Sequence, residues 1–271
     1  MSTAVTFRKR RTAGPKMFGV LIGLLYLFLL APLIIVFIVS FASDKFLTFP
    51  PSGFSLQWFE GLPQQTTFVQ GLQVSLITAP IVTAIVVVLG VPVALAIHRY
   101  DVPGRALISS LFLSPLLVPS IVVALGLVII LGPLGLTNTY LSIIVGHFGI
   151  TVPYIIRTTL MTLTTSDTST EEAARVLGAN AAQVFFKVTL PIIRPGVIAG
   201  AAIVFIISFD EPIISLFVAG SGLPTLPVQI LRYVEFSADA AVAALSVVLI
   251  LISAAAVVVV ERILGVRRTL T

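Results

Sequence analysis

The chain has 271 residues, of which 58% are hydrophobic and only 10% are charged. A soluble domain carries about 25% charged residues, so this composition excludes a disordered chain and an ordinary soluble enzyme. The mean hydropathy of +1.14 predicts that much of the surface lies in lipid. The sequence contains no cysteine, which excludes a disulfide scaffold, thiolate metal sites and thiol catalysis.

Six apolar stretches are long enough to cross a bilayer as helices, since a hydrocarbon core of about 30 Å needs about 20 residues. In chain order they are Met17–Phe41, Gly71–Ile97, Ala106–Leu131, Asn138–Leu160, Gly196–Ala219 and Ala240–Leu264. The period-two alternation that is typical of barrel strands is absent from them. We therefore predict an all-α, polytopic membrane protein with one transmembrane domain over residues 1–271.

The basic residues lie mostly on one side of these predicted spans. With the N-terminus in the cytoplasm, 14 of the 16 Lys and Arg residues are cytoplasmic, and only Lys45 and Arg232 are outside. The cytoplasmic set is Arg8, Lys9, Arg10, Arg11, Lys16, Arg99, Arg105, Arg157, Arg175, Lys187, Arg194, Arg262, Arg267 and Arg268. The positive-inside rule then predicts cytoplasmic termini. It also accounts for the pI near 9.9 without a nucleic-acid partner.

The longest predicted cytoplasmic segment, Thr164–Pro195, carries clear helix signals. Ser169 and Glu172 have the spacing of a capping box, in which each side chain accepts a hydrogen bond from the other residue's backbone amide. Gly178 suits the left-handed conformation that ends a helix. These positions predict a short helix that stops at Gly178.

A second short helix is predicted to follow, with Asn180 and Gln183 as its cap and Leu190-Pro191 as its end. Pro195 then suits the first turn of the fifth span. The two helices would form an elbow that exposes apolar side chains with few local partners, namely Val176, Leu177, Val184 and Phe185. An apolar surface of this kind indicates a docking site for another protein.

The spacing of this elbow resembles the EAA loop of binding-protein-dependent ABC importer permeases. In that family the pattern is Glu-Ala-Ala, three residues, Gly, nine residues, Ile, one residue and Leu-Pro. This chain has Glu172-Ala-Ala174, Gly178, Val188 and Leu190-Pro191 at those positions, so Val188 in place of isoleucine is the one departure.

Three further stretches are similar to the second permease subunit of spermidine/putrescine-type importers. They are Ser114–Ser120, Thr151–Tyr154 and Ser208–Glu211. The last one departs conservatively from a Ser-Phe-Asp-Asp pattern, because Glu211 replaces the second aspartate. Members of this subfamily serve several small solutes.

The resemblance implies a type I ABC importer permease in the bacterial cytoplasmic (inner) membrane. Its coupling helices would enter a groove of the ATPase through Glu171, Glu172, Ala173, Ala174, Gly178, Leu190 and Pro191. Within this set, Glu172 would pair with the ATPase, Gly178 would form the elbow, and Leu190-Pro191 would form the exit.

The resemblance also implies three kinds of protein partner. They are an ATPase subunit dimer that binds ATP and Mg, an external solute-binding protein, and a second permease, with a paralogue favoured over an identical copy. The sequence has no phosphate-binding Gly-x-x-x-x-Gly-Lys-[Ser/Thr] loop and no nucleophile–base set. We therefore expect no catalytic residue and no cofactor on this chain, and ATP hydrolysis on a separate subunit.

Acidic residues lie inside the fifth predicted span, at Asp210 and Glu211. A charged side chain at this depth costs about 2.5 kcal/mol or more, so it needs a partner or a wet cavity. Pro212 follows and should break the helix, which frees the carbonyl of Ser208. We predict that Asp210, more than Glu211, lines the path of a cationic amine together with Ser208 and Phe209. Burial of the pair against a partner subunit, or a shorter helix that ends there, stays open.

Two other functions also stay open. The same importer architecture would suit an amino-acid derivative, an opine or a quaternary amine as solute. An ATP-independent secondary transporter is the less favoured class. His147 is predicted to be a hydrogen-bonded packing residue, and because His98 lies at the opposite interface, no metal site is expected.

Overall fold

The computed structural model describes residues 14–100, 104, 107, 110–112, 114–220, 222–237 and 239–264. The predicted basic residues before position 14, Arg105, and Arg267 and Arg268 lie outside this part. Five helices in it are long and apolar enough to cross a membrane. They span Phe18–Ser40, Thr66–Arg99, Tyr140–Thr164, Ala181–Phe209 and Ala241–Val259. The prediction of an all-helical membrane protein is confirmed, whereas the count of six spans stays a prediction.

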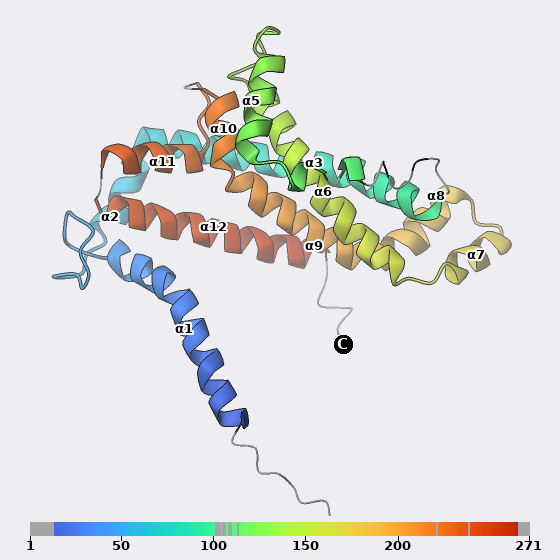
Figure 1. Ribbon diagram of the computed structural model, residues 1–271, viewed down its shortest axis with the longest axis horizontal. Coiled ribbons are helices and arrows are strands. Elements are labelled where there is room, and N and C mark those ends of the chain that lie inside the picture. Colours follow the sequence, from blue (N-terminus) through green and yellow to red (C-terminus); the bar gives the residue numbers. More distant parts are fainter. Residues whose placement is uncertain are drawn as a thin grey trace, which may run out of the picture.

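Three helices form the core: α3 (Thr66–Arg99), α6 (Tyr140–Thr164) and α9 (Leu190–Phe209). They run along the long axis of the molecule (Figure 1), and their buried aliphatic side chains form one cluster. Glycines let the helices approach closely, because a β-carbon at Gly90 of α3 or Gly200 of α9 would overlap Ile155 of α6. Small residues at helix contacts are typical of membrane bundles.

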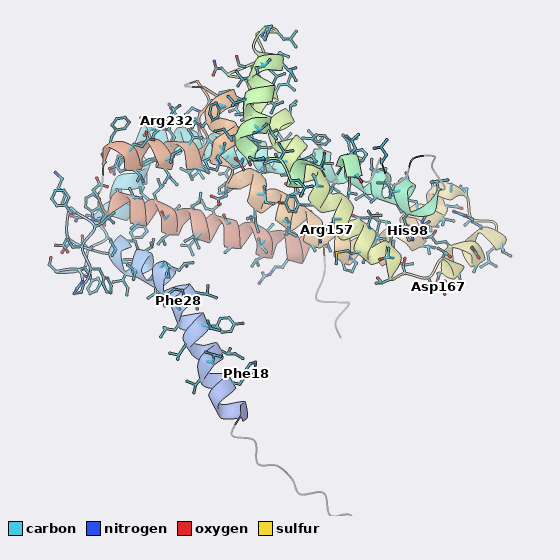
Figure 2. The ribbon with its side chains drawn as sticks, viewed as in Figure 1. Phe18, Phe28, His98, Arg157, Asp167 and Arg232 are labelled. Atoms are coloured by element: carbon cyan, nitrogen blue, oxygen red, sulfur yellow. The ribbon has the colours of Figure 1, made fainter. Side chains whose placement is uncertain are left out.

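Two long helices lie outside this core. Helix α12 (Ala241–Leu264) packs on α9, and α1 (Gly14–Ser40) packs on α12. Figure 1 shows α1 diverging from the bundle, and Figure 2 labels Phe18 and Phe28 on its diverging part. Both side chains are exposed, so α1 leaves an apolar surface that the rest of the chain does not cover.

The two ends of the long axis differ in what they carry. One end holds α2 (Gln57–Gly61), the 3₁₀ turn η1 (Leu62–Gln64) and α11 (Leu226–Phe236). The opposite end holds the two short helices α7 (Ser169–Val176) and α8 (Ala181–Val184). The segment with the resemblance to an EAA loop is therefore far from α2 and α11.

The predicted span Ala106–Leu131 is not one continuous helix in the described part of that range. Ser114–Leu116 forms a short 3₁₀ turn, η2, and α5 begins only at Ser120 and ends at Leu131. Pro119 between them has extended backbone, with ψ 135°. The physical reason is that Pro115 and Pro119 lack the amide hydrogens that a continuous helix needs.

The predicted span Gly196–Ala219 is broken near its end, as expected, but its predicted start is wrong. The helix begins earlier, at Ala181, and ends at Phe209. A separate short helix, α10, covers Pro212–Val218. The break follows from Pro212, which starts a helix well because its missing amide hydrogen is not needed in a first turn. The prediction of a break at the acidic pair is confirmed.

Candidate functional site

The elbow between α7 and α8 has the predicted geometry at its centre. Gly178 has a φ of +90°, in the region where glycine avoids the cost of a β-carbon. The amide of Gln183 donates to Asn180 Oδ1 at 2.9 Å, and the amide of Asn180 donates to Gln183 Oε1 at 3.0 Å. The predicted stop at Gly178 and the second capping box are therefore confirmed.

The predicted capping box at the start of α7 is wrong, because Asp167 takes its place. The amide of Ser169 donates to Asp167 Oδ1 at 3.0 Å, and its hydroxyl donates to Oδ2 at 2.8 Å. The backbone bond and then the side-chain bond lower the pKa of Asp167, since both favour the charged carboxylate. Asp167 thus takes the Ser169 amide that the predicted capping box assigned to Glu172.

Glu171 faces inward from α7, although it belongs to the predicted ATPase-coupling set. Its side chain is 6% exposed and forms a two-pronged ion pair with Arg99, the last residue of α3. The hydroxyl of Thr189 donates to Glu171 Oε1 at 2.7 Å. Figure 2 shows His98 and Asp167 at the same end of the molecule, where α3 ends and α7 begins. Glu171 thus connects three segments that are distant in sequence.

The next acid, Glu172, is exposed together with Ala173. Val176 and Leu177 are 88% and 87% exposed, as predicted. The prediction for the second helix is wrong in part, because Val184 is buried and Phe185 is half-buried, while Phe186 is exposed. We call Glu172, Ala173, Val176 and Leu177 the α7 face. It is an apolar surface with one carboxylate and no covering element within the described residues.

The helix after the elbow continues through Leu190-Pro191, so the prediction of an end there is wrong. Phe185–Thr189 forms a π-helical segment, η3, in which the amide of Leu190 bonds to the carbonyl of Phe185. The wider turn accommodates Pro191, whose ring would clash with a carbonyl in a regular α-helix. Pro195 then lies inside α9 instead of opening it.

The acidic pair at the end of α9 is divided between two roles. Glu211 Oε1 accepts hydrogen bonds from the amides of Ile213 and Ile214, at 2.9 and 3.1 Å, and so caps α10. Asp210 follows the last residue of α9, is exposed, and makes no side-chain hydrogen bond or ion pair within the described residues. One acid therefore stabilises the break, and the other carries a free carboxylate beside it.

The other two predicted path residues lie inside the bundle. Ser208 is buried, and Phe209 is buried and stacks on Phe205 with ring centroids 5.6 Å apart. Their assignment to the path stays a prediction.

His147 of α6 is fully buried and holds both sides of the break together. One ring nitrogen lies 2.9 Å from Ser208 Oγ in α9, and the other lies 2.9 Å from Ser215 Oγ in α10. A neutral imidazole donates from one nitrogen and accepts at the other, so both bonds can form together. His147 is a hydrogen-bonded packing residue, as predicted. Within the described residues, no group of three or more His, Asp or Glu side chains could hold a metal ion.

Sequence reasoning missed Arg99 and Thr189 as partners of the elbow. Arg99 lies 72 positions before Glu171, and Thr189 lies 18 positions after it. The local pattern of charges gives no sign of these contacts. The sequence feature that could have indicated such a contact is the pair of adjacent acids, Glu171 and Glu172. Adjacent residues on a helix point about 100° apart, so the two carboxylates rarely share one role.

Comparisons with known proteins identify the family of this chain. Residues 87–266 match the family described as the binding-protein-dependent transport system inner membrane component. The spermidine/putrescine transport system permease protein PotC of Haemophilus influenzae is 30% identical over 233 residues, which are 86% of this chain and 90% of PotC. The putrescine transport system permease protein PotI of Escherichia coli is 29% identical over 232 residues, which are 83% of this chain and 82% of PotI.

A solved structure shares the fold. It is a bacterial ABC transporter involved in the import of the acidic polysaccharide alginate, with a TM-score of 0.69 and 18% identity over 98% of this chain and all of that one. At this identity the likeness concerns the fold alone. The family match and the sequence relatives carry the assignment. The chain belongs to the binding-protein-dependent transport system inner membrane components: it is a multi-pass permease subunit of an ABC importer, and ATP hydrolysis belongs to a separate subunit.

Proposed function

We propose that this permease lines the path of a small cationic amine of the polyamine class. The relatives PotC and PotI, which are named for spermidine and putrescine transport, support this cargo. The fold gives no support either way, because a transporter of an acidic polysaccharide has it too.

The single observation that carries the proposal is the free carboxylate of Asp210. Its neighbour Glu211 is occupied by the cap of α10, whereas Asp210 has no partner within the described residues. An unpaired carboxylate is costly inside a membrane domain unless it faces water or a cation. An ammonium group supplies the positive charge and the hydrogen-bond donors that Asp210 lacks.

We propose that the membrane topology has six crossings with both termini in the cytoplasm. Residues 114–119, together with α5, would belong to the sixth crossing and interrupt its helix at Pro119. Prolines are tolerated in such a crossing where neighbouring helices or water satisfy the freed backbone groups. The basic residues of the elbow, among them Arg175 and Lys187, would then lie on the cytoplasmic side. The whole chain is one domain in this proposal.

We propose the α7 face as the docking surface for the ATPase. Its Glu172, Val176 and Leu177 are exposed, and they lie on or directly after a short helix whose first turn is held by the contacts of Glu171. One chain has one such elbow, so an ATPase dimer implies a second permease, which we propose is a paralogue. The uncovered apolar surface of α1 suits that subunit and lipid. ATP and Mg would bind the ATPase, and an external solute-binding protein would deliver the solute.

Uptake into proteoliposomes tests the cargo. The permease, its paralogue and the ATPase are reconstituted with the binding protein, and radiolabelled spermidine or putrescine is supplied. We expect ATP-dependent uptake by the wild type. Asp210→Asn should reduce it about tenfold, because one charge-assisted contact of about 1.4 kcal/mol is worth that factor.

Glu211→Gln is the matched control, since the amide oxygen can still cap α10 while the charge is lost. We expect it to retain most of the uptake. Equal uptake by Asp210→Asn and wild type, with equal amounts of assembled complex, would contradict the role of Asp210. ATP-dependent uptake of a different solute in a competition panel would overturn the polyamine cargo, and uptake without ATP would indicate a secondary transporter.

A further inference from the structure

The contact between Arg99, Glu171 and Thr189 joins the elbow to two core helices, and we call it the elbow clamp. Arg99 is the last residue of α3, Glu171 lies in the first turn of α7, and Thr189 precedes α9. Each partner therefore sits where a helix begins or ends. A connection at such a point transmits displacement along a helix axis instead of bending the helix in its middle.

The chemistry of the elbow clamp makes it rigid. Both oxygens of Glu171 engage the guanidinium of Arg99, and Oε1 also accepts the Thr189 hydroxyl. A planar, two-pronged pair fixes orientation as well as distance. Glu171 and Thr189 are buried, so water competes weakly for these hydrogen bonds and breaking them leaves buried polar groups unsatisfied.

The π segment η3 lies directly at the clamp. A π turn carries one residue more than an α turn, so it rotates the residues after it by about 100° relative to an uninterrupted helix. Thr189 is the last residue of this segment and is the one that reaches Glu171. The irregular turn therefore coincides with the position where the helix must contact α7.

We infer that Glu171 is a positioning residue that makes α7, the end of α3 and the start of α9 move as one body when the ATPase moves the elbow. This inference rests on the proposed docking of the ATPase at the α7 face. Force would enter through the exposed Glu172 side of α7 and leave through the buried Glu171 side. The two acids thus divide contact and transmission between them.

A spin-label distance tests the inference independently of the cargo. The chain has no cysteine, so Thr170→Cys on α7 and Tyr100→Cys just after α3 provide one labelled pair at exposed positions. The distance is measured in the assembled complex without nucleotide and with ATP. In the wild-type background we expect one narrow distribution that ATP leaves unchanged.

Glu171→Gln keeps the shape and an acceptor for Thr189, but it presents an amide NH₂ to the guanidinium. We expect a broader distribution that shifts with ATP, and a fall of about tenfold in solute imported per ATP hydrolysed, within the usual range of coupling between sites. This ratio separates transmission from stability, because a merely unstable subunit would lose uptake and hydrolysis together. The double change Arg99→Glu with Glu171→Arg should restore the narrow distribution.

Glu60→Gln is the matched control, since it removes one exposed carboxylate from α2 at the opposite end of the molecule. We expect it to leave both the distance and the ratio unchanged. Three results would each overturn the inference. They are a wild-type distance that shifts with ATP, a distance distribution for Glu171→Gln as narrow as that of the wild type, and a distribution for the charge-swapped double variant as broad as that of Glu171→Gln. If the complex does not take up polyamines but the labelled pair in the wild-type background keeps one narrow distance, only the proposed polyamine cargo is contradicted.

Discussion

Two pairs of adjacent acids, one at the elbow and one at the break after α9, follow the same division. Glu171 is bound by Arg99 and Thr189, while Glu172 is exposed. Glu211 caps α10, while Asp210 has no partner within the described residues. In each pair one carboxylate holds the local structure and the other is available to something outside the chain.

The two pairs differ in which of the two acids is bound within the chain, and in the kind of contact that binds it. At the elbow the first acid is held by a charge from a distant helix, and at the break the second is held by amides of the next turn. A long-range ion pair fixes one element against another, whereas a cap stabilises only its own helix. The two regions show that adjacent acids need to be assigned individually.

The largest expected effect comes from truncating the held acid of the elbow. Glu171→Ala should lower the free energy of unfolding by about 3 kcal/mol, because it leaves Arg99 without its counter-charge. Thermal unfolding of the detergent-solubilised complex measures this loss. Glu172→Ala should leave the midpoint unchanged, and equal losses for the two variants would contradict the division.

A smaller effect is expected at the break. Glu211→Ala should destabilise α10 by about 1 kcal/mol, because two amides of its first turn lose their acceptor. Hydrogen exchange at Ile213 and Ile214 reports this opening. Asp210→Ala should leave that exchange unchanged while reducing uptake. Faster exchange in both variants would show that Asp210 also supports the helix.

The smallest expected effect concerns Asp167, which holds the start of α7. Its pKa is lowered from 3.8 in the folded protein. Its stabilisation is therefore complete above the unfolded-state pKa and is lost as the pH falls through the lower folded value. A fluorophore on Thr170→Cys should report local opening at acidic pH. Asp167→Asn should already be partly open at neutral pH, and an unchanged signal in that variant would remove Asp167 from this role.

Much of the elbow could be predicted from neighbouring residues. The stop at Gly178 and the cap formed by Asn180 and Gln183 depend on backbone groups within a few positions. The contact between Asp167 and Ser169 was missed although it is also local, because Asp167 and Glu172 are both close enough in sequence to accept from the Ser169 amide. The continuation through Pro191 was missed because a π turn leaves no clear pattern in sequence.

In the membrane helices, too, features that depend on neighbouring residues could be predicted, and features that depend on distant contacts could not. Apolar runs indicated where helices lie, and Pro212 indicated the break at the acidic pair. The interruption at Pro119 has the same local cause, a missing amide hydrogen, whereas the start at Ala181 depended on the π-helical segment that carries the helix past Pro191. Ser208 and Phe209 could not be assigned, because their burial depends on His147 and Phe205.

The sequence by itself determined that this is a helical membrane protein with an elbow at Gly178 and a helix break at the acidic pair, because hydropathy, glycine and proline act locally, and the spacing of the loop carried the resemblance to ABC importer permeases. Only the tertiary structure decided that Glu171, which the resemblance grouped with Glu172 in the coupling set, faces inward and is held by the core. Helix geometry separates two adjacent side chains by about 100°, but the direction of each depends on what packs nearby. For Glu171 that partner is Arg99, 72 positions away, a contact that only the folded chain creates.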